Sequence, residues 1–89
     1  MPELKTTKAF IKKMLKIVSK NAKLLEIIEG RLKSLAENPS AFHLENHKLK
    51  GHLKDYYSVT ITTSIRLIFY IHPSGYFVLV DIGTHDEVY

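Results

Sequence analysis

The sequence contains no cysteine and no apolar run long enough to cross a membrane. A transmembrane helix needs about 20 consecutive apolar residues, and the apolar core of a secretory leader is missing from the first ten residues, MPELKTTKAF. Without cysteine, disulfides and thiolate chemistry are excluded, so the fold must depend on its hydrophobic core. We therefore expect a cytoplasmic protein with no membrane association.

The composition also excludes disordered, collagen-like and coiled-coil chains. Apolar residues make up 45% and charged residues 25% of the 89 residues, which are ordinary values for a globular domain. A chain of this length is large enough for one core and too small for two. Because no repeat, low-complexity tract or linker is visible, we expect a single domain over residues 1–89.

Positive charge is concentrated near the start of the chain. The formal net charge is +4, and seven of the 13 basic residues are lysines between positions 5 and 23, where no acidic residue occurs. Apolar residues such as Phe10, Met14 and Val18 fall at helical spacing among them, so the lysines are expected to form the solvent face of an amphipathic helix. The alternative is a dedicated contact with nucleic acid or with an acidic protein.

Two helices are predicted in the first part of the chain. Thr6 or Thr7 should cap the first helix, and Asn21 is expected to end it in a left-handed conformation. The second helix runs from about residue 22 to 37 and stops before a proline. Because the link is short, the helices should form an antiparallel hairpin, and we expect Gly30 to mark a close approach between them.

The rest of the chain is typical of β-strands. Residues 57–62 alternate between apolar and polar side chains, which predicts a strand with one buried and one exposed face. After a tight turn, residues 65–71 form an apolar strand, and residues 76–82 form another. A short edge strand is expected at residues 48–50. The order of elements predicts an α+β fold, with the helical hairpin packed on a three- to four-stranded, mainly antiparallel twisted sheet.

One charged residue interrupts an apolar strand. Arg66 is a permanent cation, which is tolerated there only if its head reaches water, an anion or a partner. We expect it to share an exposed working face with Ser58 and Thr60. The alternative is a structural ion pair with Asp81 or Glu87. Four tyrosines are expected to serve packing rather than base stacking: Tyr56, Tyr57, Tyr70 and Tyr76.

Four segments, in this order, resemble the RelE/ParE toxins of type II toxin–antitoxin systems, and most of all the YafQ-like branch. They are Asn46–Gly51, Leu53–Tyr57, Arg66–Tyr70 and Asp81–Tyr89. The resemblance covers essentially the whole chain. It implies a ribosome-dependent endoribonuclease that cuts mRNA in the ribosomal A site, together with a cognate antitoxin that covers its surface. The toxin would be a monomer or part of a toxin–antitoxin hetero-oligomer.

RNA cleavage by attack of a 2′-hydroxyl needs a base, a cation or donor for the phosphate, and an acid, but no metal or other cofactor. Histidine, whose unperturbed pKa is about 6.5, can serve as either base or acid. The resemblance implies that His47 is the general base, His85 the general acid and Arg66 the phosphate-stabilising group. It also implies that Tyr89 stacks on a base or orients the substrate.

Several other polar residues are candidates for holding the RNA backbone without reading its sequence. They are Lys48, Lys50, Lys54, Thr60 and Ser64. The last two stand where related toxins carry titratable groups. The polar face of the hairpin therefore supplies hydroxyls, and more of the acid–base work falls to His47 and His85.

Other interpretations stay open. A ParE-like toxin would share the fold but inhibit DNA gyrase without nuclease chemistry, and an inactive homologue would retain only antitoxin binding. His43 and His47 have a spacing that suits two metal ligands on a helix, but no second pair at zinc-like spacing accompanies them. No metal site is predicted.

Overall fold

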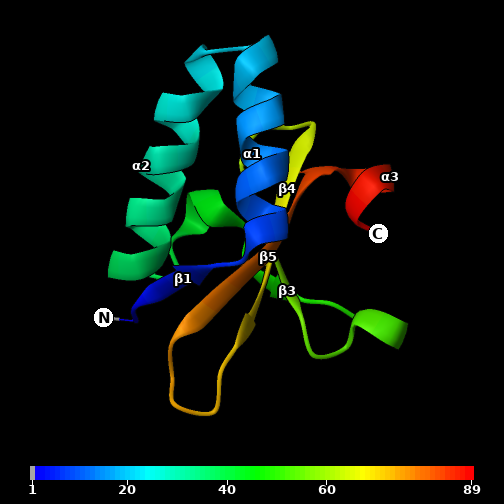
Figure 1. The fold of residues 1–89 in the computed structure, drawn as a ribbon. Coiled ribbons are helices and arrows are strands. Elements are labelled where there is room, and N and C mark those ends of the chain that lie inside the picture. Colours follow the sequence, from blue (N-terminus) through cyan, green and yellow to red (C-terminus); the bar gives the residue numbers. More distant parts are fainter. Residues whose placement is uncertain (1) are drawn as a thin grey trace.

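The computed structural model describes residues 2–89 and shows a helical hairpin packed on one face of a twisted sheet (Figure 1). This two-layer arrangement confirms the predicted α+β fold. The elements within these residues are β1 (Leu4–Thr6), α1 (Lys8–Lys20), α2 (Lys23–Glu37), β2 (His47–Lys48), β3 (Tyr57–Thr60), β4 (Ile65–Ile71), β5 (Phe77–Thr84) and α3 (His85–Val88), with short 3-10 helices at Phe42–Leu44 and Gly51–Leu53.

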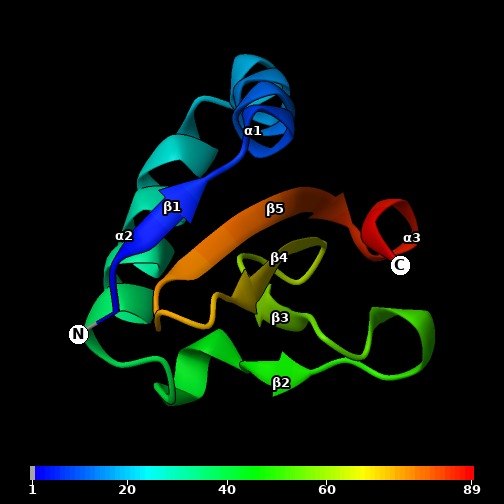
Figure 2. The same ribbon diagram turned by 60° about the horizontal axis from the view of Figure 1, so that its bottom comes forward.

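The sheet has five strands in the order β1-β5-β4-β3-β2, one more than the largest number predicted (Figure 2). The additional strand is β1, which runs parallel to β5 and pairs Leu4 with Phe77. The other neighbouring strands are antiparallel. Three residues are too few to show a period of two, and the pairing partner of β1 lies at the far end of the chain, so its own residues carry little signal.

The first helix is held to the sheet at its N-terminus. Thr7 caps α1, with its side-chain oxygen accepting a hydrogen bond from the Phe10 N–H at 3.1 Å. The same hydroxyl donates to the Leu79 carbonyl of β5 at 3.2 Å. Phe10, in the first turn, is fully buried. One threonine therefore both starts the helix and fixes its position over β5.

Two details of the helical hairpin differ from the sequence-based expectation. Asn21 has φ −150°, which is extended and not left-handed, because α2 follows at once and the Asn21 side chain accepts a hydrogen bond from Lys23 N–H at 3.3 Å. Gly30 does not mark a close approach of the helices either. A Cβ at that position would meet no atom within 4 Å.

The β3–β4 connection is longer than the predicted tight turn. Strand β3 ends at Thr60, and the Thr62 hydroxyl accepts hydrogen bonds from the N–H groups of Ser64 and Ile65 at 3.2 and 3.1 Å. A threonine side chain that bonds to nearby backbone competes with the strand ladder, which ends the strand early. Strand β4 begins at Ile65, as predicted.

A single core lies between the helices and the sheet. Its members are apolar and at most 1% exposed: Phe10, Ile28, Leu35, Leu44, Val59, Ile61, Leu67, Phe69, Leu79 and Ile82. On the sheet side the Phe69 ring stacks on Tyr57 at 5.3 Å and on Phe77 at 4.7 Å between centroids. The predicted burial of the odd-numbered face of β3 and β4 is therefore confirmed, and the even-numbered residues face away from the helices.

We predict that Gly30→Ala stabilises the protein. Because the new methyl group enters open space, only the helix propensity changes, and the free energy of unfolding should rise by about 1 kcal/mol. Thermal denaturation should show a midpoint higher by about 4–8 °C. As a matched control, Gly83→Ala should lower the midpoint, because its Cβ would lie 3.1 Å from Glu87 Oε1. A Gly30→Ala midpoint equal to or below wild type would contradict the prediction.

Candidate functional site

A row of side chains crosses three strands on the sheet face opposite the helices. His47 of β2 pairs with Ser58 of β3, and Ser58 pairs with Ile68 of β4. Thr60 pairs with Arg66 in the neighbouring row. Directly paired residues project from the same face, and diagonal neighbours such as Ser58 and Arg66 lie about 7–8 Å apart. Two of the sequence-predicted catalytic residues, His47 and Arg66, therefore belong to one surface.

The end of the chain folds onto this surface. The Tyr89 hydroxyl donates a hydrogen bond to Ser58 Oγ at 2.5 Å. The Tyr89 ring in turn meets the His85 ring edge-on, with centroids 4.3 Å apart. Ser58, Tyr89 and His85 thus form a connected group of side chains, and His47 pairs with Ser58 from the neighbouring strand. We name these four residues the Ser58 cluster. Sequence reasoning placed Ser58 on this face but did not include it in the site.

The polar face of the hairpin is less open than the sequence suggested. Ser58 is 0% exposed and Ile68 only 3% exposed, whereas an exposed working face was expected. The correction has a simple cause, because Tyr89 reaches Ser58 and Val88, 9% exposed, is buried beside β4 and β5. The accessible part of the face lies around the covered centre, at His47, Thr60 and Arg66.

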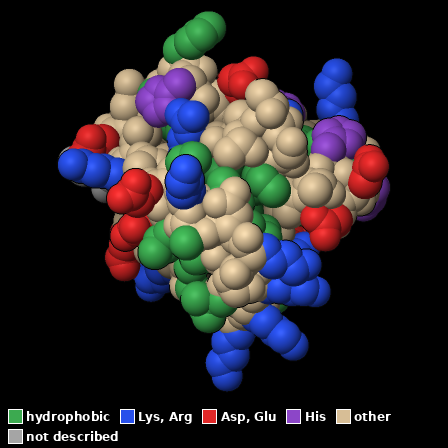
Figure 3. All heavy atoms as spheres, turned by 90° about the horizontal axis from the view of Figure 1, so that it is seen from above, with side chains coloured by type: hydrophobic (Ala, Val, Ile, Leu, Met, Phe, Trp, Pro, Cys, Tyr) green, Lys and Arg blue, Asp and Glu red, His purple; other side chains and the backbone are tan. Residues whose placement is uncertain are grey.

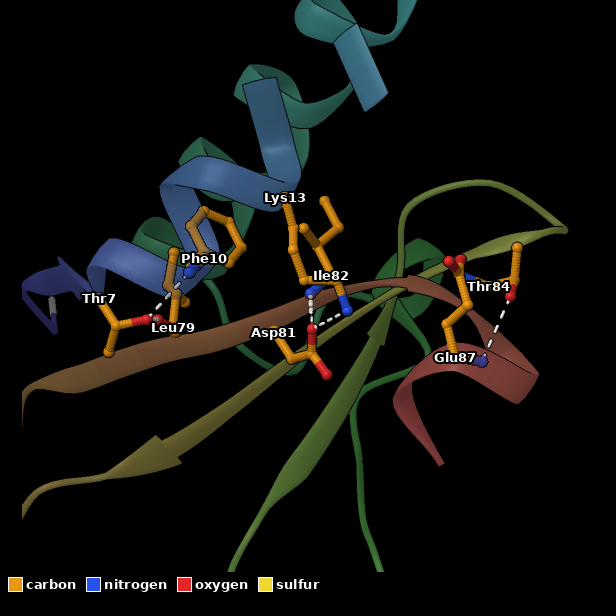
Figure 4. Close-up of polar contacts among 8 residues, drawn as sticks. All are labelled: Thr7, Phe10, Lys13, Leu79, Asp81, Ile82, Thr84 and Glu87. Atoms are coloured by element: carbon orange, nitrogen blue, oxygen red, sulfur yellow. Dashed lines mark hydrogen bonds and ion pairs between the residues drawn. The ribbon is translucent and has the colours of Figure 1, made fainter. Parts of the chain in front are cut away.

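The short helix α3 is fixed by a capping box. Thr84 N–H donates to Glu87 Oε1 at 2.8 Å, and Glu87 N–H donates to Thr84 Oγ1 at 3.4 Å (Figure 4). The pKa of Glu87 lies below its ordinary value, chiefly because its carboxylate accepts the Thr84 backbone hydrogen bond. The Thr84 side chain and the nearby charges of Lys13 and Lys16 lower it further. The box therefore holds the turn that carries His85.

The tautomer of His47 follows from its backbone contact. His47 Nδ1 lies 2.9 Å from the Glu45 carbonyl oxygen, which can only accept a hydrogen bond. Nδ1 must therefore carry the hydrogen, and the neutral ring presents the lone pair of Nε2. Glu45 adopts a left-handed conformation with φ 48°, which turns the chain just before β2. His47 is exposed, so this lone pair is open to a ligand.

Arg66 is held by the loop that precedes it. Its Nη1 donates to the carbonyls of Thr62 at 2.7 Å and Thr63 at 3.1 Å. The alternative ion pairs with Asp81 or Glu87 are not formed. Asp81 pairs instead with Lys13 of α1 at 2.5 Å, and Glu87 belongs to the capping box (Figure 4). Within residues 2–89, no carboxylate forms an ion pair with the guanidinium.

The residues predicted to hold RNA differ in their distance from the cluster. Lys48 directly follows His47, and Thr60 pairs with Arg66. Lys50 and Lys54 flank the 3-10 helix Gly51–Leu53 and are exposed, and Ser64 lies exposed in the β3–β4 loop. Seen from above the helical hairpin, several Lys and Arg side chains lie along the lower side of the view, and others are scattered over the rest of that face (Figure 3).

The two histidines with helical spacing do not meet. His43 Nε2 contacts Ser34 Oγ at 3.1 Å, while His47 contacts the Glu45 carbonyl. His72 lies in the β4–β5 turn, where its ring stacks on Tyr76 at 4.2 Å. Over residues 2–89 no three His, Cys, Asp or Glu side chains are grouped so that they could hold a metal ion.

The same residues match a known family. A family model described as "Bacterial toxin of type II toxin-antitoxin system, YafQ" matches residues 2–89. The chain belongs to the YafQ toxin family. No curated protein sequence matches it.

Solved structures share this fold. YafQ from E. coli strain BL21(DE3) has a TM-score of 0.80 at 18% identity, with 100% of this chain and 99% of that chain covered. YafQ in the E. coli DinJ–YafQ complex has a TM-score of 0.78 at 18% identity, with 100% and 99% covered. A metal-bound toxin from Helicobacter pylori has a TM-score of 0.75 at 30% identity, with 100% of both chains covered. In this YafQ-family chain, no helix within residues 2–89 has the length and apolar character of a membrane span.

We predict that the C-terminal turn loosens at acid pH. A carboxylate whose pKa is lowered by folding stabilises the fold above its unfolded pKa, about 4.3 for glutamate, and this contribution is lost as the pH falls through the folded pKa. The thermal midpoint of Glu87→Gln should therefore lie below that of wild type near neutral pH, and the two midpoints should converge in acid. Glu29→Gln, at an exposed position of α2, is the control. A Glu87→Gln difference that is the same at all pH values would contradict this account.

Proposed function

We propose that this YafQ-family chain is a metal-independent endoribonuclease that cleaves mRNA at the ribosomal A site. The observation that carries the proposal is the Ser58 cluster. Strand pairing and the Tyr89 hydrogen bond bring His47 and the C-terminal pair of His85 and Tyr89, which are far from His47 in sequence, to one serine. Two imidazoles on one accessible surface with an arginine suit acid–base cleavage of a phosphodiester.

Each group has a defined role in the proposed reaction. His47 Nε2 removes the proton from the 2′-hydroxyl, whose oxygen attacks the adjacent phosphorus. The Arg66 guanidinium, which has no carboxylate partner in residues 2–89, stabilises the charge that develops on the phosphate oxygens. Protonated His85 donates its proton to the leaving 5′-oxygen. The products are a 2′,3′-cyclic phosphate and a free 5′-hydroxyl.

Tyr89 and Ser58 support this chemistry as positioning residues. The Tyr89 hydroxyl is occupied by Ser58, so its ring is held against the ring of His85. Tyr89 thereby orients the proposed general acid, and its remaining ring surface is available to a base. Lys48, Lys50, Lys54, Thr60 and Ser64 are proposed to contact the RNA backbone, because all are polar and all but the half-buried Thr60 are exposed.

The decisive experiment is to map cleavage ends on mRNA in a reconstituted translation reaction. Wild type should leave 2′,3′-cyclic phosphate ends, and His47→Ala and His85→Ala should each lower the cleavage rate by about 10²–10⁴-fold, the usual contribution of a general acid or base. His72→Ala is the matched control, because this histidine lies in the β4–β5 turn. Intact mRNA together with inhibited gyrase supercoiling would instead support a ParE-like toxin.

An antitoxin is the proposed protein partner. E. coli YafQ, which shares this fold, is known in complex with DinJ. A groove of about 330 Å³ runs between α1 and the end of β5, lined by Lys13, Lys16, Ile17, Lys20, Ile65, Ile82, Thr84 and Glu87. Its isoleucines supply apolar surface and its lysines supply positive charge, so it suits an acidic amphipathic segment. A groove that bound only the RNA backbone would not need the apolar surface of these isoleucines.

We predict that Lys16→Glu with Lys20→Glu weakens antitoxin binding. Exposed pairs contribute about 0.2–1 kcal/mol each, so the dissociation constant should rise by about 2- to 30-fold and depend less on salt. Binding to the protein from the adjacent reading frame can be measured by calorimetry. Lys33→Glu is the control, because Lys33 lies on α2 and is 4.0 Å from Glu37. Equal effects of the two charge reversals would place the antitoxin elsewhere.

A further inference from the structure

A cleft of about 530 Å³ opens beside the Ser58 cluster. It lies where β3 begins and β4 ends, next to β2. Its lining residues are Lys48, Asp55, Tyr56, Tyr57, Tyr70 and Ile71. Lys48 directly follows the proposed general base, His47, on β2. Lys48 pairs with Tyr57, so its side chain projects from the opposite face of β2 to that of His47, and the cleft and the proposed cleavage site meet at the β2 edge of the sheet.

Two of the tyrosines differ in their surroundings from the third. Tyr57 stacks on Phe69 of the core, so its ring is committed to packing. Tyr56 and Tyr70 meet only edge to face, with centroids 6.0 Å apart and planes at 90°, and both are half-buried. This perpendicular arrangement leaves ring surface facing the cleft. By strand alternation both rings lie on the face of Ser58, about 7 Å along the strands from it.

The cleft also presents one charge of each sign. Within residues 2–89, neither Lys48 nor Asp55 takes part in an ion pair, although both line the same cleft. A lysine suits a phosphate, and an ionised aspartate can only accept hydrogen bonds, which suits the amino group of a base. Ile71, 43% exposed, adds apolar surface. A groove that served only to hold a phosphate would need neither the aspartate nor the aromatic rings.

We infer that this cleft binds one base of a single-stranded RNA next to the scissile phosphate. The inference rests on the proposed nuclease function and adds the element that reads the substrate. The base packs against both Tyr56 and Tyr70, Lys48 contacts the neighbouring phosphate, and Asp55 accepts a hydrogen bond from an exocyclic amino group. Cytosine carries such an amino group and uracil does not, so cytosine is preferred over uracil at this position. The earlier expectation that Tyr56 and Tyr70 serve packing alone is replaced by this assignment.

Binding can be measured without cleavage. Short RNA strands with 2′-O-methyl sugars lack the attacking hydroxyl, and the chain has five tyrosines and no tryptophan, so its fluorescence reports tyrosine alone. We expect Tyr56→Leu and Tyr70→Leu each to weaken binding by about 5- to 150-fold, which corresponds to about 1–3 kcal/mol for one stacked base. Tyr76→Leu, in the β4–β5 turn, is the matched control and should bind like wild type.

The base preference has its own test. Wild type should bind strands with cytosine at the reading position more tightly than the matched uracil strands, and Asp55→Asn should remove most of this difference while keeping the affinity for uracil. NMR spectra of the wild-type protein provide a second readout that does not depend on a variant folding. The ring signals of Tyr56 and Tyr70 should shift on adding the RNA, and those of Tyr76 should not.

The outcomes separate this inference from the proposed function. RNA that shifts the Tyr56 and Tyr70 signals, in a protein that leaves mRNA intact, supports the cleft and overturns the nuclease. Cleavage of mRNA that is equally fast in wild type, Tyr56→Leu and Tyr70→Leu, with unchanged RNA affinity, overturns the cleft and keeps the nuclease. Signals that shift with the antitoxin but not with RNA assign the cleft to protein binding and overturn the inference.

Discussion

The hydrogen bond between Tyr89 and Ser58 is the constraint on which the candidate site depends. Ser58 is fully buried, and a buried hydroxyl without a partner carries a large desolvation penalty. Tyr89 satisfies it and, by doing so, brings the C-terminal turn over the sheet face that opposes the helices. The capping box of Thr84 and Glu87 then sets the orientation of the turn that carries His85. The hydrogen bond that satisfies buried Ser58 thus also helps to position His85, which is proposed to react.

The charges around the site follow a similar logic. Two nearby carboxylates are engaged elsewhere, Asp81 with Lys13 of α1 and Glu87 with the Thr84 backbone. Asp86, which follows His85 directly, has its Oδ1 3.6 Å from His85 Nδ1. Because Arg66 has only backbone carbonyls as partners in the described chain, its charge is not neutralised by the fold. An anion that approaches the accessible rim of the Ser58 cluster therefore meets a positioned cation. The α1 lysines Lys13, Lys16 and Lys20 lie elsewhere, along the groove between α1 and the end of β5.

Local pattern was enough to predict most of the architecture. The helical spacing of Phe10, Met14 and Val18 and the period of two along β3 are properties of adjacent residues, so both elements were found. What escaped prediction depends on distant parts of the chain. β1 exists because β5 offers it an edge, and Ser58 is covered because Tyr89 reaches it. The tautomer of His47 likewise depends on a left-handed turn at Glu45 that no local pattern predicts.

The place of β5 in the sheet has a consequence for how the chain folds. This strand lies between β1 and β4, and the bond from Thr7 to Leu79 spans 72 positions. The contact between α1 and α2 and the pairing of β5 with β4 are both local, whereas pairing of β1 with β5 closes a loop of nearly the entire chain. Such closure is the slow and entropically costly event in small domains. Helix formation is therefore expected to precede sheet completion. The amides of β5 should be among the last to exchange with solvent, since opening them requires both ends of the protein to separate.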